Sequence, residues 1–165
     1  RDGKELFMAT HADTAQLIHE LILHRYRMSD GVAQAHVEEL DIPGYLALHR
    51  IADTAANKDD PNGRTYLQDL ADNMQVSVRQ VSKLAESLRD RGLVQWAHDG
   101  NGDEGTYVVI TDAGRRLMTG KEQALKDYYS RVVEAYGRDE LRQLLGMMQR
   151  LETVMNAAWN ETEVK

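Results

Sequence analysis

A cluster of polar side chains in the middle of the chain has the chemistry to recognise nucleic-acid bases. Arg79 and Lys83 carry N–H donors that fit the edge of guanine, and Gln80 carries the amide that pairs with adenine. Ser77 and Ser82 supply hydroxyls that bond to a base edge or to a phosphate. All five residues fall within one short stretch, so a single element must present them together.

The apolar residues interleaved with this cluster predict that the element is a helix. They recur at helical spacing and form one buried stripe, which consists of Val81, Leu84, Ala85 and Leu88. The remaining residues, Arg79, Gln80, Ser82, Lys83 and Glu86, then face outward. Ser77 and Gln80 have the spacing of a capping box that starts the helix, and Gly92 after Arg91 is suited to end it.

A second amphipathic segment directly precedes this helix. Its stripe consists of Leu67, Leu70, Ala71 and Met74. Thr65 and Gln68 have the spacing of another capping box, and the small side chain of Ala71 permits a neighbouring helix to approach. With a tight turn around Gln75, the two segments predict a helix-turn-helix whose second helix enters the DNA major groove.

A change of period after Gly92 predicts a two-stranded wing. The segments 93–98 and 107–110 are rich in β-branched and aromatic residues, and a glycine-rich loop joins them. This loop contains Asp99, Asp103 and Glu104 but no Arg or Lys, and residues 45–118 hold nine Arg or Lys against eleven Asp or Glu. We therefore expect weak non-specific binding. The predicted DNA contacts are Arg64, Thr65, Ser77, Arg79, Gln80, Ser82, Lys83 and Arg89.

Long amphipathic helices are predicted on both sides of this module. The first opens at a capping box formed by Asp13 and Gln16 and ends near Ser29, and residues 32–40 are a further helical candidate. Pro43 interrupts that segment, so the next helix is placed over residues 45–56. Beyond the wing, Thr111-Asp112 and Asp139 start the last two helices, which Gly137 separates.

These elements predict a mainly α fold with a small β-hairpin wing. The winged helix-turn-helix occupies residues 45–118, and residues 10–40 and 119–162 form a long-helix dimerisation arm.

The segment from Thr65 to Met118 resembles the MarR family, the multiple antibiotic resistance regulators. The resemblance lies in Leu70-Ala71, Val76-Ser77, Leu84, Leu88-Arg89-Asp90-Arg91-Gly92-Leu93-Val94 and Ile110-Thr111-Asp112-Ala113-Gly114. It implies a homodimer built by the first, fifth and sixth helices, a palindromic operator in double-stranded DNA, and a small organic effector bound between arm and winged domain. The wing departs from the Asp-x-Arg loop typical of the family, because it has no arginine.

Aromatic residues of the long helices are candidates for the effector site that the resemblance implies. Tyr26, His49 and Tyr128 are the predicted ligand-binding residues. The alternative is that the row formed by Tyr128, Tyr129 and Tyr136 is dimer core.

The composition excludes several other classes of protein. With no cysteine among 165 residues, disulfides, zinc–cysteine fingers and cysteine nucleophiles are ruled out. A net charge of −7 argues against a protein that coats nucleic acid non-specifically. No apolar run approaches the roughly 20 residues that span a bilayer, so we expect no membrane partner and a cytoplasmic location.

The function predicted from the sequence is a ligand-modulated transcriptional regulator, more specifically a repressor. No catalytic motif and no cofactor-binding motif is found, so we expect neither an enzyme nor a bound cofactor. One alternative is a winged-helix dimer that binds a protein or a ligand and binds DNA weakly or not at all. A third is a zinc-responsive regulator, since Glu20 and His24 lie four residues apart and His11, His19, His36 and His49 are in flanking segments.

Overall fold

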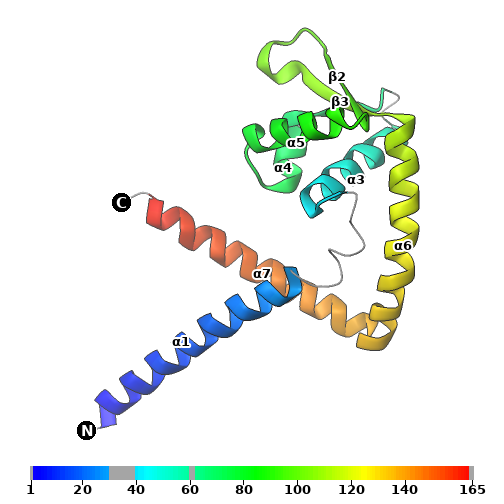
Figure 1. The fold of residues 1–165 in the computed structure, drawn as a ribbon. Helices are drawn as coiled ribbons and strands as arrows, with labels where there is room; N and C mark the ends of the chain where they lie inside the picture. The colour runs from blue at the N-terminus through cyan, green and yellow to red at the C-terminus, as the bar shows by residue number, and fades with distance from the viewer. Residues whose placement is uncertain (1, 30–39, 60–61, 164–165) are drawn as a thin grey trace. The chain divides into compact units, whose positions relative to one another are not determined.

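The computed structural model describes residues 2–29, 40–59 and 62–163, in two units (Figure 1). The first unit spans Arg1–Lys121 and the second Glu122–Lys165. The elements of the first unit are α1 (Asp2–Ser29), α3 (Ile42–Ala56), β1 (Thr65–Tyr66), α4 (Leu67–Met74), α5 (Val78–Asp90), β2 (Val94–His98), the short 3-10 helix η1 (Gly102–Gly105), β3 (Thr106–Ile110) and the start of α6 (Asp112–Tyr136). The rest of α6 and α7 (Arg138–Glu163) form the second unit.

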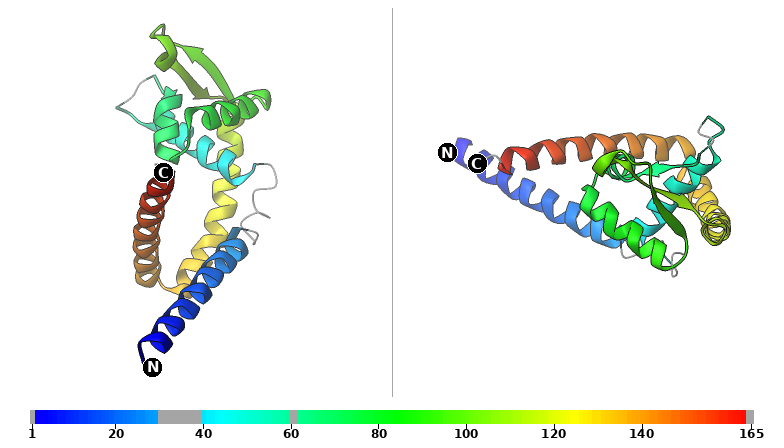
Figure 2. Two further views of the ribbon diagram at one scale, coloured as in Figure 1. Left: turned by 90° about the vertical axis from the view of Figure 1, so that its left-hand side faces the viewer. Right: turned by 90° about the horizontal axis from the view of Figure 1, so that it is seen from above.

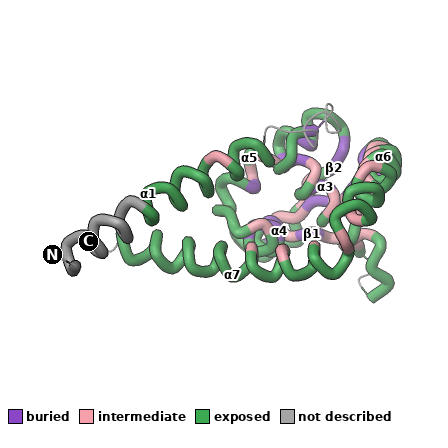
Figure 3. The backbone as a smooth tube through the Cα atoms, turned by 90° about the horizontal axis from the view of Figure 1, so that it is seen from below, coloured by how far each residue is buried: buried purple, intermediate pink, exposed green. Residues whose placement is uncertain are grey.

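The core lies between three helices and a small sheet. Its most deeply buried side chains come from α3, α4, α5, β2 and β3, and they are Leu48, Ile51, Leu70, Val81, Leu88, Val94 and Val108. Figure 3 shows the buried segments gathered there, whereas α7 and the described part of α1 are mostly exposed. Burial of these apolar side chains is the main stabilising term of the winged-helix module.

The sheet has three antiparallel strands in the order β1-β3-β2. Trp96 of β2 and Thr65 of β1 both lie opposite Val108 on the central strand. The predicted wing is therefore confirmed, but it shares β3 with a strand that the sequence pattern did not predict. Figure 1 and the left-hand view of Figure 2 show the β2–β3 hairpin reaching beyond the helices beside it.

The helix-turn-helix is present as α4 and α5, and Gln75 makes its turn tight. Gln75 adopts the left-handed conformation at φ 55° and ψ 45°, the region that favours glycine. The capping box at the start of α5 is confirmed. The Gln80 N–H donates to Ser77 Oγ at 3.2 Å, and the Ser77 N–H donates to Gln80 Oε1 at 3.0 Å.

The joint between the wing and α6 depends on a close backbone approach. Thr111 Oγ1 donates to the Gly92 carbonyl at 2.6 Å and accepts from the Gly114 N–H at 3.1 Å, so it ties the end of α5 to the start of α6. A Cβ on Gly114 would collide with the Leu93 carbonyl, and this contact explains the glycine.

Several predicted helix starts were wrong. The first helix begins at Asp2 rather than at Asp13, and Gln16 instead donates to Glu20 at 3.1 Å within it. Thr65 is paired in β1, so it cannot cap α4, whose N-cap is Tyr66 without a side-chain hydrogen bond.

Two further boundaries moved by a few residues. The α3 helix begins at Ile42, because Pro43 is accepted in its first turn and Asp41 Oδ1 accepts the Gly44 N–H at 2.8 Å. The α7 helix begins at Arg138, one residue before the predicted cap Asp139. The helical candidate over residues 32–40 lies outside the described residues except for Leu40.

Candidate nucleic-acid interface

The exposed face of α5 carries the residue types predicted to contact DNA. Behind it, Val81, Ala85 and Leu88 are at most 1% exposed and hold the helix against the core. Arg79, Gln80, Lys83 and Glu86 are exposed on the opposite side, and Ser82 is half-buried. The helix therefore presents Arg79 and Lys83 to solvent while its opposite side is packed against the core.

The capping box limits which hydrogen-bonding atoms of Ser77 and Gln80 remain available to DNA. Gln80 Oε1 accepts from both the N–H and the hydroxyl of Ser77, at 3.0 and 3.1 Å. Bidentate recognition of adenine needs both the amide oxygen and the amide nitrogen of a glutamine. In this geometry only the Nε2 donors of Gln80 remain available, so Arg79 and Lys83 are the stronger candidates for reading bases.

Arg89 lies at the other end of α5, in contact with the wing. Its guanidinium carbon is 5.3 Å from the centre of the Trp96 ring on β2, and its Nη2 is 3.6 Å from Asp90 Oδ1. The arginine is half-exposed, and the aromatic ring limits the positions it can take.

Arg64 and Thr65, the two predicted contacts at β1, differ in accessibility. The Arg64 guanidinium lies 4.5 Å from the centre of the Tyr107 ring. A hydrogen bond to the Tyr66 side chain is the main reason why the pKa of Arg64 is raised above its ordinary value. Thr65 lies opposite Val108 in the sheet and is only 3% exposed, so it presents far less surface than Arg79 or Lys83, and its contact with DNA stays a prediction.

The loop of the wing is acidic and held by its own hydrogen bonds. Asp99 accepts the Asn101 N–H at 2.9 Å and the Tyr66 hydroxyl at 2.9 Å. These bonds, with the one from the Asn101 backbone first, lower the pKa of the Asp99 carboxyl. The neighbouring Asp103 and Glu104 are exposed, so the loop offers carboxylates where a DNA phosphate would need cations.

The three predicted effector-binding residues, Tyr26, His49 and Tyr128, have different local surroundings. Tyr26 on α1 is 62% exposed, whereas His49 on α3 stacks on Tyr45 with the ring centres 6.0 Å apart. Tyr128 is in the second unit, where it meets Tyr129 edge to face. None of the three predicted residues lines the cavity between α5 and α3 or the cavity among α3, β1 and α4.

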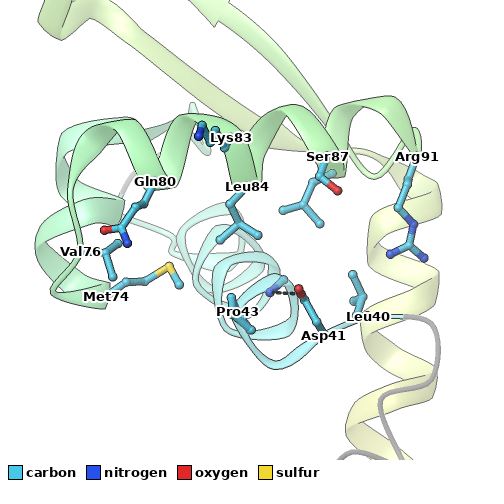
Figure 4. Close-up of a pocket in the computed structure, with 12 residues that line it drawn as sticks. Leu40, Asp41, Pro43, Met74, Val76, Gln80, Lys83, Leu84, Ser87 and Arg91 are labelled. Atoms are coloured by element: carbon cyan, nitrogen blue, oxygen red, sulfur yellow. Dashed lines mark hydrogen bonds between the residues drawn. The ribbon is translucent and has the colours of Figure 1, made fainter.

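A cavity of about 600 Å³ lies between α5 and the start of α3, and sequence reasoning did not predict it. Figure 4 shows Leu84 pointing from α5 toward Pro43 and Asp41. The lining residues are Leu40, Asp41, Pro43, Gly44, Met74, Val76, Gln80, Lys83, Leu84, Ser87, Leu88 and Arg91. The one signal in the sequence was Leu84, which belongs to the predicted buried stripe yet is only half-buried. Gln80 and Lys83 belong both to the candidate interface and to the lining of this cavity.

Among the side chains that the structure describes, no group of three or more His, Asp or Glu is arranged to hold a metal ion. His11 and His36 of the zinc alternative lie among residues whose side chains are not described. None of the helices in the described ranges is long and apolar enough to cross a membrane.

Comparison with known proteins finds similarity in structure alone. No protein-family model matches the sequence, and no curated protein matches it. A MarR family regulator from Neisseria meningitidis is similar at a TM-score of 0.65 and 15% identity, over 91% of this chain and 98% of that one.

Two other solved structures are similar over most of their length. CouR from Rhodococcus jostii, bound to p-coumaroyl-CoA, has a TM-score of 0.63 and 20% identity, over 81% of this chain and 90% of that one. MepR from Staphylococcus aureus, in complex with DNA, has a TM-score of 0.61 and 14% identity, over 86% of this chain and 97% of that one. At these identities the likeness concerns the fold. The predicted fold class is confirmed, and the chain has the winged helix-turn-helix fold of MarR-family transcriptional regulators.

Proposed function

We propose that the protein is a MarR-family transcriptional regulator, a repressor that binds a palindromic operator as a homodimer and responds to a small organic effector. The observation that carries this proposal is the face of α5, where Arg79 and Lys83 are exposed above a buried stripe. A helix held in this way fits the major groove, and two copies would read half-sites about 34 Å apart. The DNA complex of MepR and the p-coumaroyl-CoA complex of CouR support the two kinds of partner.

The effector has to act by preferring one arrangement of the dimer. A ligand that binds the DNA-competent and the DNA-incompetent arrangement equally well shifts nothing, whatever its affinity. Release of the operator therefore requires contacts that exist in only one of the two arrangements.

The test of the DNA-binding proposal is the substitution Arg79→Ala. Truncation of a base-reading arginine should weaken specific operator binding by about 1–3 kcal/mol. The operator is first isolated by selection from genomic fragments with the purified protein, and affinity is then measured by fluorescence anisotropy at fixed salt.

The matched control is Arg116→Ala, which truncates an exposed arginine on α6 rather than on α5. It should leave operator affinity near that of the unsubstituted protein. Equal affinity of the Arg79→Ala variant would refute the assignment of α5 as the reading helix.

The acidic wing favours a second candidate function, a module that binds a protein or a ligand and has little affinity for DNA. Asp99, Asp103 and Glu104 stand where a wing would approach the phosphate backbone. A salt titration separates the two candidates. Operator binding should weaken steeply as salt rises, whereas the second candidate predicts no specific DNA complex even at low salt.

A further inference from the structure

A second cavity of about 500 Å³ lies among α3, β1 and α4, and its size falls within the range of small-ligand sites. It is lined by Arg50, Thr54, Arg64, Thr65, Tyr66, Asp69, Asp72 and Asn73. Unlike the cavity beside α5, this one has mainly polar and charged walls. Its occupant must therefore be a polar molecule.

Charges of both signs face this cavity without neutralising one another. Among the described residues, no ion pair joins Arg50 or Arg64 to Asp69 or Asp72. Asp72 accepts a hydrogen bond from Gln68 Nε2 at 2.9 Å, which leaves its charge in place. Arg64 is hydrogen-bonded to the uncharged Tyr66 side chain and also keeps its charge, so two cations and two carboxylates line the cavity in their charged forms.

Thr65 adds a buried hydroxyl that has nothing to bond to. The residue is 3% exposed, and its Oγ1 has no hydrogen-bond partner among the described residues. A buried polar group without a partner is costly, so such groups are uncommon in folded proteins. Because Oγ1 has no bond to lose, a rotation between staggered rotamers can turn it toward a ligand oxygen at small cost.

Two features next to β1 favour an anionic group in this cavity. The Tyr107 ring, 4.5 Å from the Arg64 guanidinium carbon, restricts the guanidinium before any ligand arrives. Tyr66, the N-cap of α4, makes no side-chain capping bond, so no cap competes for the first N–H groups of that helix.

We propose that this cavity binds a small zwitterion, such as an α-amino acid, with its carboxylate toward Arg50, Arg64 and Thr65 and its ammonium toward Asp69 and Asp72. A purely anionic ligand would meet the two aspartates, and a purely cationic one would meet the two arginines. The same argument disfavours a DNA phosphate. The lining has no net formal charge, which matches a ligand that has none.

The location of the cavity indicates how a bound ligand would affect DNA binding. The ligand would link α3 to α4, the first helix of the helix-turn-helix, and would engage Arg64, one of the candidate DNA contacts. We therefore expect it to change operator affinity. This consequence rests on the proposed function, whereas the binding itself does not.

The test is isothermal titration calorimetry on the full chain without DNA. The probes are a panel of the standard α-amino acids, with acetate and methylammonium as compounds that carry one charge each. At least one amino acid should bind, and acetate and methylammonium should each bind about tenfold more weakly or worse, because each loses one set of charged contacts.

Substitutions then locate the site. Arg50→Gln and Asp69→Asn should each weaken amino-acid binding about tenfold, and Arg116→Gln on α6 is the matched control that should not. Thr65→Val has nearly the same shape and removes the unpaired hydroxyl. It should therefore keep or raise the unfolding temperature while it weakens binding, and this combination separates a ligand contact from a folding defect.

Either of two results overturns the proposal: no amino acid binds, or one binds with equal affinity to the Arg50→Gln and Asp69→Asn variants. If no amino acid binds and Arg50→Gln weakens operator binding, the cavity is a phosphate contact and the proposal fails. Failure of the protein to bind any operator would refute the proposed function and leave the calorimetric result standing.

Discussion

At the scale of single residues, Asp99 links the wing to β1. Its carboxylate accepts from the Tyr66 hydroxyl and from the Asn101 N–H, and both bonds favour the charged form. Since the folded state lowers the pKa of Asp99 from the ordinary value of 3.8, its contribution to stability is present above that pH. It is lost as the pH falls past 3.8 toward the lower folded value.

Asp99→Asn should remove part of this acid sensitivity. The asparagine cannot be protonated in this range, so the unfolding temperature of the variant should change less below pH 3.8 than that of the unsubstituted protein. Thermal unfolding followed by circular dichroism over an acid series measures this. Asp103→Asn is the control, because no hydrogen bond or ion pair of Asp103 is found among the described residues. Parallel curves for the Asp99→Asn variant and the unsubstituted protein would contradict the expectation.

Residue identity alone predicted some members of the candidate interface and not others. The exposure of Arg79 and Lys83 followed from the period of α5, since both lie opposite its apolar stripe. The burial of Thr65 could not be predicted in this way, because Thr65 belongs to a strand that forms only with β3, which is distant in sequence. The predicted capping box implied that Ser77 would donate a hydrogen bond to Gln80 Oε1. The sequence does not show whether this oxygen accepts from Ser77 or from a DNA base.

At the scale of elements, the turn between α4 and α5 stores strain at Gln75. A residue other than glycine in the left-handed region costs about 1–2 kcal/mol, while glycine costs about 0.5–1 kcal/mol in chain entropy. Gln75→Gly should therefore stabilise the protein by about 0.5–1 kcal/mol in chemical denaturation. Gln68→Gly, the same change on the exposed side of α4, should destabilise it by about 1 kcal/mol. A loss of stability in the Gln75→Gly variant would show that the turn is not strained.

The elements that the sequence predicted well are those whose signals are local. The stripes of α4 and α5, the capping box at Ser77 and the β-rich segments of the wing each lie within a few residues. β1 has two residues and forms by pairing with the edge of β3, so no local sequence pattern predicts it. The capping motif at Thr65 was misleading for the same reason, because a Thr-x-x-Gln sequence is compatible with a strand when a partner is present.

At the scale of the whole molecule, most of the exposed large hydrophobic side chains in the described part of the chain lie on the long helices. Large hydrophobic side chains with at least 39% of their surface exposed include Leu17, Ile18, Leu21 and Ile22 on α1 and Leu145, Leu151, Met155 and Trp159 on α7. Each helix thus carries an apolar stripe, and monomeric proteins rarely leave large apolar patches exposed to water. The stripes of α1 and α7 are therefore the surfaces that we expect the proposed homodimer to bury, over an area on the order of 1,200–2,000 Å² or more.

Leu151→Glu should convert the dimer to a monomer, because it places a charge that has no partner within a desolvated interface. Size-exclusion chromatography with light scattering should give the mass of one chain, 18.7 kDa, for the variant and twice that for the unsubstituted protein. Gln149→Glu puts the same charge on an exposed polar position of the same helix and should remain dimeric. Since the core of the winged helix contains no residue of α7, the monomer should keep its helical circular dichroism signal while losing affinity for the two-half-site operator. A Leu151→Glu variant that stays dimeric would move the interface away from this stripe.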